Sequence, residues 1–200
     1  MIEKIKNILI NPKGEFEKME KEEAPAMMTT YTSYSMILSF IPAICTVIGW
    51  GLIGYTVSIL GFSQSFRSFE VGIKAGIIVL ISSAASFFVS TYIVDALAPN
   101  FKATKNINRA AQLVAAVLTP ASIAGIFCLM PNLDSLMIIG AVYGAYILYL
   151  GLPFLMKSPA DQTPVYTIAV ILVVIITFAI ISMILRSVLI GNGGGFAGGF

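Results

Sequence analysis

Residues Gly140 to Tyr166 read GAVYGAYILYLGLPFLMKSPADQTPVY, an apolar run without charge that ends in a short polar loop. Three tyrosines recur in the run at three-residue spacing, and the loop holds Lys157 and Asp161. Apolar runs of about 20 residues are long enough to cross the hydrocarbon layer as helices. Because the rest of the chain repeats this pattern of apolar runs and short polar connectors, this stretch decides the fold class.

The composition of the 200-residue chain is that of an integral membrane protein. Apolar residues make up 58% and charged residues 11%, with a mean hydropathy of +0.91, whereas soluble proteins carry about 25% charged residues. Helices that span a bilayer expose apolar side chains to lipid and do not have to bury them. The net charge is only +2 and there is no basic tract, so we expect the lipid bilayer as a partner and no nucleic acid.

Five apolar runs predict an all-α integral membrane protein with five transmembrane helices and a short N-terminal amphipathic helix. The predicted spans are residues 34–60, 71–94, 110–129, 135–156 and 164–189. The short turn between the third and fourth spans predicts antiparallel neighbours. The fifth span lacks a row of small residues, so we expect it at the periphery, facing lipid.

The spans divide the chain into three parts. We expect a cytoplasmic amphipathic segment over residues 1–33, a five-span membrane domain over 34–190 and a flexible glycine-rich tail over 191–200. In the first part, Ile2 and Leu9 recur at helical spacing and predict an amphipathic helix on the membrane surface. A second short helix starts at Pro12. Its many charged side chains are either a solvated face or a docking surface for a protein partner.

The distribution of basic residues predicts the orientation. With the N-terminus inside, nine of the twelve Lys and Arg residues fall on the cytoplasmic side and three on the other. Positively charged connectors stay in the cytoplasm. We therefore expect a multi-pass protein of the cell membrane with its N-terminus in the cytoplasm and its C-terminus outside.

Several spans contain residues that shape helix packing. Proline removes a backbone hydrogen bond inside a helix, so three prolines predict hinges: Pro42, Pro120 and Pro153. Small residues four apart let helices approach closely and predict either the helix core or a homo-oligomer interface; these are Gly72 with Gly76 and Gly140 with Gly144.

Two groups of polar residues are candidate functional sites. Tyr143, Tyr146 and Tyr149 form an intramembrane polar face, whose hydroxyls either bond to neighbouring helices, such as the row Ser82, Ser86 and Ser90, or line a path for a polar substrate. The second group is a polar cluster on the cytoplasmic side, which is either an interfacial ion pair or a partner site, and comprises Asp95, Asn100, Lys157 and Asp161.

The sequence offers little for catalysis. It has no histidine, the commonest general base and a common metal ligand. The motifs Gly-x-Ser-Gly and Gly-x-Gly-Asp of intramembrane proteases do not occur, and the glycine-rich tail lacks the Lys-Ser/Thr of a phosphate-binding loop. We therefore predict a non-enzymatic protein with no catalytic residues, cofactor or metal.

Motifs along nearly the whole chain resemble the Yip domain family, the Ypt/Rab-interacting five-span membrane proteins, in its prokaryotic branch. The motifs are Asn11-Pro12 with Phe16 and Glu17, Asp95-x-Leu97-Ala98-Pro99, Thr119-Pro120, and the run Tyr143-x-x-Tyr146-x-x-Tyr149-Leu150-Gly151-Leu152-Pro153-x-Leu155-Met156-Lys157-x-Pro159. The resemblance implies five spans and a cytoplasmic N-terminus. Eukaryotic members are linked to Golgi and ER traffic and to Rab-type GTPases, but their Asp-Leu-Tyr-Gly-Pro element does not occur here.

These observations lead to two functional hypotheses. The first is a membrane-organising or partner-binding scaffold of the Yip type, whose N-terminal segment and polar cluster face the partner. The alternative is a small transporter or channel that passes an ion, lipid or small solute along the tyrosine face. A continuous polar cavity reaching Tyr146 would favour transport, and a dry, close-packed interior would favour the scaffold.

Overall fold

The computed structural model describes residues 1–59, 62–66 and 68–189; the predicted tail 191–200 lies outside them. The longer elements are α1 (Ile2–Ile10), α2 (Pro12–Lys21), α3 (Met27–Thr30), α4 (Met36–Ile48), β1 (Tyr55–Ile59), β2 (Phe62–Phe66), α5 (Phe69–Leu97), α6 (Ile107–Ala124), α7 (Met137–Leu155) and α8 (Thr163–Leu189). Short π-helical and 3-10 turns extend or connect them: η1 (Tyr31–Ser35), η2 (Gly49–Ile53), η3 (Ala98–Phe101), η4 (Gly125–Leu129) and η5 (Pro131–Leu136).

Five helical segments are long and apolar enough to cross a membrane, which confirms the predicted fold class. They are Met27–Ile53, Phe69–Phe101, Ile107–Leu129, Met137–Leu155 and Thr163–Ile181. Their most apolar windows have mean hydropathies between 1.8 and 2.8, and each segment reaches about the 30 Å of a hydrocarbon core at 1.5 Å per residue. The protein is therefore a multi-pass membrane protein.

The first span differs from its predicted bounds of 34–60. It begins at Met27, where the side chain of Asn108 accepts the backbone N–H of Met27 at 3.0 Å. It ends at Ile53, because Gly54 has φ 82°, a conformation that glycine adopts without strain. The apolar residues that follow form β1, which pairs with β2 as an antiparallel hairpin that the sequence analysis did not predict.

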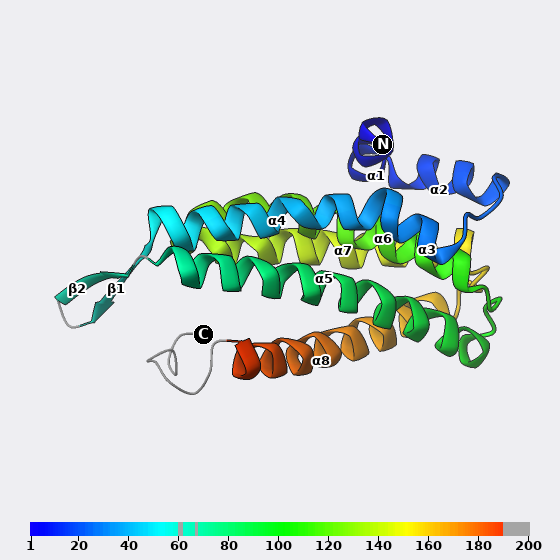
Figure 1. Ribbon diagram of the computed structural model, residues 1–200. Helices are drawn as coiled ribbons and strands as arrows, with labels where there is room; N and C mark the ends of the chain where they lie inside the picture. Colours follow the sequence, from blue (N-terminus) through cyan, green and yellow to red (C-terminus); the bar gives the residue numbers. More distant parts are fainter. Residues whose placement is uncertain (60–61, 67, 190–200) are drawn as a thin grey trace.

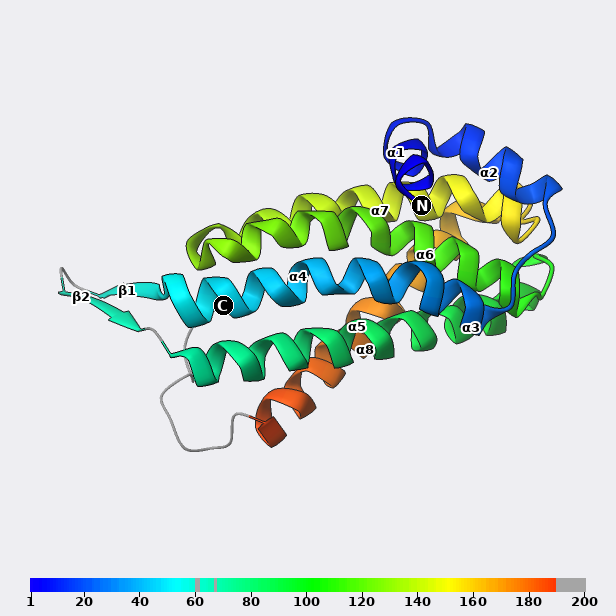
Figure 2. The ribbon, with the colours of Figure 1, turned by 45° about the horizontal axis from the view of Figure 1, so that its top comes forward.

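The spans form an elongated bundle with two distinct ends (Figures 1 and 2). The helices α6 and α7 are antiparallel neighbours, as predicted, and α4 packs against α5. The hairpin projects from one end, whereas α1 and α2 lie over the other, which we call the capped end. Since the first described residues lie at the capped end and α8 runs towards the hairpin end, five crossings separate the two ends of the described chain.

The helix α8 lies at the periphery, as predicted. Only 19% of its most apolar window is buried, against 39–44% for the other spans. Tyr166 and Val170 on one side are buried near α5, whereas Ile168, Leu172 and Ile175 are more than half exposed. Side chains of this kind on the outside of a bundle face lipid.

The N-terminal helices α1 and α2 exist, but they pack against the bundle. The side chains of Ile8, Phe16 and Met19 are buried in the main apolar core, and α2 contacts α7. Ile2, which was expected on the membrane-facing side, is 82% exposed. Helix α1 thus turns Ile8 towards the protein and leaves Ile2 exposed, and its contact with the membrane surface stays a prediction.

Candidate functional site

The capped end is assembled around Arg109 in the first turn of α6. Its guanidinium donates to the backbone carbonyls of Met19, Glu20 and Glu22, at 3.3 Å for Glu20 and 2.6 Å for Glu22, and to the side chain of Gln112 at 3.1 Å. The last carbonyls of a helix lack partners within the helix and carry partial negative charge. A planar cation with several N–H groups satisfies them together. Arg109 therefore fixes the C-terminal end of α2 on the bundle.

Two further polar contacts hold the N-terminal helices. The hydroxyl of Tyr143 in α7 donates to the carbonyl of Leu9 at 2.8 Å, at the last turn of α1. Lys157, which follows α7 in a left-handed conformation with φ 55°, forms an ion pair with Glu20 of α2. Together with Arg109 of α6, these contacts from α7 and its C-terminal loop position α1 and α2.

An aromatic side chain anchors α2 in a notch of α7. Phe16 is fully buried and stacks on Phe154 with ring centroids 6.5 Å apart. The notch exists because residue 151 is glycine: a Cβ there would lie 2.7 Å from Phe16 Cζ and would also meet Leu113. Burial of a phenylalanine side chain contributes about 1.5–3 kcal/mol, so Phe16 is a main source of docking energy.

A lysine of α1 is placed over an aromatic ring of the first span. Lys4 Nζ lies 5.6 Å from the centroid of the Tyr34 ring, within the range of a cation–π contact. Burial lowers the pKa of Lys4, and the nearby carboxylates Glu15 and Glu22 oppose that shift. The Tyr34 hydroxyl lies 2.8 Å from Thr119 Oγ1 of α6, which joins the first and third spans.

The predicted polar cluster lies at the capped end without direct contacts among its members. In the part of the chain that the structure describes, no hydrogen bond or ion pair joins any two of the four residues. Lys157 contacts Glu20, and Asn100 is exposed. Asp161 is exposed too, and a hydrogen bond from Gln162 holds its pKa below the usual range.

Asp95 is the buried member of this predicted cluster. It is 8% exposed, and its Oδ2 lies 4.0 Å from Nζ of Lys105 in the loop before α6. Its other oxygen, Oδ1, is buried without a hydrogen-bond partner among the described residues. Asp95 thus contributes an ion pair between the last turn of α5 and the loop before α6, whereas Asn100 and Asp161 contribute surface charge and polarity.

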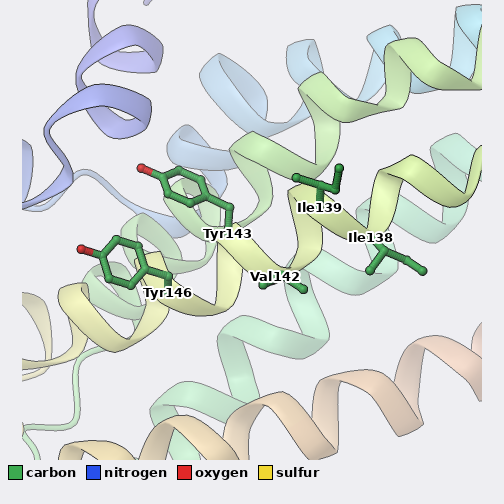
Figure 3. A pocket seen from close by; sticks show the side chains of 5 residues that line it. All are labelled: Ile138, Ile139, Val142, Tyr143 and Tyr146. Atoms are coloured by element: carbon green, nitrogen blue, oxygen red, sulfur yellow. The ribbon is translucent and has the colours of Figure 1, made fainter.

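The tyrosine row lies on the outer side of α7. Tyr146 is 51% and Tyr149 is 44% exposed. Tyr143 and Tyr146 line an open hollow of about 360 Å³ with Ile138, Ile139 and Val142, all from α7 (Figure 3). This hollow is a surface depression and does not lie between the spans.

The proposed serine partners are not bonded to the tyrosines. Ser82, Ser86 and Ser90 of α5 are buried, and the hydroxyls of Ser82 and Ser86 have no hydrogen-bond partner among the described residues. Tyr143 instead bonds to α1, at the capped end. The tyrosine row therefore bonds to α1 through Tyr143, whereas Tyr146 and Tyr149 are exposed on the outside of the bundle.

The predicted packing glycines lie where helices of one chain touch. Gly72 and Gly76 of α5 face α4, where added Cβ atoms would meet Gly51 and Val47. Gly140 and Gly144 of α7 face α6, at the carbonyls of Pro120 and Val117. The three predicted hinge prolines lie inside helices: Pro42 in α4, Pro120 in α6 and Pro153 in α7.

Sequence reasoning missed the anchoring role of Arg109. Its one available signal is position: Asn106 caps α6 by accepting the N–H groups of Asn108 and Arg109, both at 3.1 Å. This places a cation in the first helical turn, where the helix dipole disfavours it. Such a residue is expected to find anionic or carbonyl partners elsewhere. Within the described residues, no group of three or more His, Cys, Asp or Glu side chains is placed to hold a metal ion.

Comparison with known proteins gives one result. The sequence matches the Yip1 domain family over residues 6–181, a range that includes α2, the capped end and most of α8. The comparisons found no match among curated proteins or among solved structures.

Proposed function

The chain belongs to the Yip1 domain family, and from this premise we propose that it is a non-enzymatic membrane-organising scaffold that binds a protein partner at its capped end. The observation that carries the proposal is the rigid attachment of α1 and α2. Ile8, Phe16 and Met19 are buried in the protein and the terminal carbonyls of α2 bond to Arg109, whereas Ile2 and Ile10 of α1 are exposed. The side chains left at the surface are mostly charged, namely Glu3, Lys6, Lys13, Glu17, Lys18, Lys21, Glu22 and Glu23.

A fixed charged surface favours partner recognition for two reasons. A pre-ordered segment avoids the entropy cost of folding on binding. Alternating charges also select a partner with the complementary pattern and speed its approach. The exposed Asn100 and Asp161 at the same end extend this surface.

We further propose that the capped end lies in the cytoplasm and that the protein resides in the cell membrane. Nine of the twelve Lys and Arg residues belong to α1, α2, the loops at this end and the first turn of α6, as expected for cytoplasmic segments. Labelling of single cysteines tests this, in a variant whose two natural cysteines are replaced. An impermeant maleimide should label Glu70→Cys but not Lys21→Cys in intact cells, and labelling of both from one side would refute the orientation.

Site-specific photo-crosslinking tests the partner proposal. A photoreactive amino acid at Lys18 should give a discrete protein adduct in native membranes, whereas the same residue at Ile175, on the lipid-facing side of α8, should not. The double swap Lys21→Glu with Glu23→Lys keeps the net charge and should abolish the adduct.

The hairpin end supplies a matched control. Glu70 and Lys74 form an exposed ion pair at 2.6 Å, and the swap Glu70→Lys with Lys74→Glu should leave the adduct at Lys18 unchanged. An adduct that survives the swap on α2 would refute the partner surface. No observation on the described residues favours the transport alternative. If vesicles that contain the protein showed a solute flux, and Tyr146→Ala abolished that flux, the transport alternative would replace the scaffold.

A further inference from the structure

Two hollows follow one another along the exposed side of α7, and together we call them the trough. Ile138, Val142, Tyr146, Tyr149 and Pro153 recur at three- and four-residue spacing, which places them on one face of the helix. The first three line the apolar hollow of Figure 3 and are 65%, 66% and 51% exposed. The last two line a second hollow of about 350 Å³. The two hollows are successive parts of one face.

Charged groups meet the trough at its second hollow. The helix α2 contacts α7 there and contributes Lys13 and Glu17, which lie one helical turn apart and have exposed side chains. Phe154 and Thr163 complete the wall. The hollow thus combines one cation, one anion and an apolar floor, and its volume is within the range of about 300–1,000 Å³ for small-molecule sites.

The part of the trough from Pro153 to Val142 matches one leaflet of a bilayer. Pro153 and Val142 are eleven residues apart, which is about 17 Å along a helix at 1.5 Å per residue. Half of the hydrocarbon layer is about 15 Å. An acyl chain that lies in the trough therefore places its headgroup beside Lys13 and Glu17, at the capped end.

We propose that this trough is a binding site for one glycerophospholipid with an ethanolamine headgroup. The ammonium of Lys13 binds the phosphate, the carboxylate of Glu17 accepts N–H groups of the ethanolamine ammonium, and an acyl chain lies along Tyr146 and Val142. The site does not depend on a protein partner at the capped end.

The pair of opposite charges selects this headgroup. A net-anionic headgroup such as phosphatidylglycerol places negative charge beside Glu17, which disfavours it. A choline headgroup carries the same charges as ethanolamine, but its quaternary nitrogen has no N–H to donate to the carboxylate. Of these three headgroups, only ethanolamine satisfies Lys13 and Glu17 together.

Photo-crosslinking in vesicles tests the proposal with the full-length protein. Vesicles contain phosphatidylethanolamine, phosphatidylcholine and phosphatidylglycerol in equal amounts, and in each arm one of them carries a photoreactive acyl chain. Peptides that contain residues 138–149 should be labelled about three- to tenfold more by the ethanolamine lipid than by the other two, as expected for one hydrogen bond to an exposed charged group. Peptides around Ile175 should show no such preference.

Substitutions assign the preference to the two charges. Glu17→Gln should remove the preference for ethanolamine over choline, and Lys13→Gln should reduce labelling of this site by all three lipids. The controls Glu23→Gln and Lys6→Gln make the same charge changes outside the trough and should alter nothing.

The alternative outcomes overturn the proposal. Equal labelling by the three lipids in the natural sequence would mean a boundary lipid without a site. A preference for phosphatidylglycerol would mean a general basic surface. If Val142→Trp, which fills the trough without touching the charges, left the ethanolamine preference intact, the acyl-chain position would be wrong.

Discussion

Removal of the guanidinium of Arg109 should release α2 from the bundle while leaving the spans folded. Arg109 donates to three carbonyls at the end of α2. A hydrogen bond from a charged donor contributes about 1.5–3 kcal/mol when it is shielded from water. Because Arg109 is only half-buried, we reduce the sum for the three bonds to about 2–3 kcal/mol. Arg109→Ala should lower the free energy of local opening of α2 by that amount.

Hydrogen exchange in nanodiscs measures this opening directly. A loss of about 2–3 kcal/mol corresponds to a decrease of about 30- to 160-fold in the protection of the α2 amides, whereas the amides of α6 should keep their protection. Arg109→Lys should give an intermediate decrease, since a compact ammonium does not span three carbonyls as a guanidinium does.

The control for charge is Lys6→Ala, because Lys6 is exposed on α1 and its loss changes the net charge equally. Unchanged protection of α2 in Arg109→Ala would refute the anchoring role. An equal loss in Lys6→Ala would show that net charge, and not the geometry at the end of α2, holds the segment.

Three further substitutions test other parts of the structure. Gly144→Leu should destabilise the protein by about 1–3 kcal/mol, because a Cβ there would lie 2.6 Å from the carbonyl of Val117. The matched change Ile175→Leu on the lipid side should leave the thermal midpoint in detergent unchanged within error. Equal midpoints for the two variants would refute this packing of α7 on α6. Lys102 has φ 55°, a left-handed conformation that glycine adopts without strain. Lys102→Gly should therefore stabilise the protein by about 0.5–1 kcal/mol and raise its thermal midpoint by about 1–4 °C. A lower midpoint would contradict this. Burial lowers the pKa of Lys4, so docking of α1 should strengthen as the pH rises from the lowered pKa towards 10.5. At pH 7 the variant Lys4→Met should therefore protect the α1 amides from exchange more than the natural sequence does. This difference in protection should vanish above pH 10.5.

The membrane-spanning part of the fold was predictable because it follows from composition over about 20 residues at a time. The first span was misplaced at both ends for local reasons. Its first turns contain Thr32 and Ser33, whose hydroxyls donate to the carbonyls of Met28 and Thr29 and so suit a helix despite their polarity. At the other end Gly54 stops the helix within an apolar run, and hydropathy does not register such a stop.

The arrangement at the capped end depends on contacts between residues far apart in sequence. Phe16 docks beside Gly151, and no periodicity in α2 reveals this notch. The sequence pattern places the tyrosines of α7 along one side of their helix, and in the structure Tyr143 bonds to α1 whereas Tyr146 faces outwards. In a membrane protein lipid and core are both apolar, so the pattern alone does not say which side faces which.

The bond between Tyr143 and Leu9 joins residues 134 positions apart, which has a consequence for biosynthesis. At about 5–20 residues per second, α1 leaves the ribosome about 7–27 s before the helix that will hold it. During that delay Ile8, Phe16 and Met19 lack the surfaces of α6 and α7 that cover them in the folded protein. Closure of the N-terminal helices over the bundle is thus a late event that marks completion of the fourth crossing.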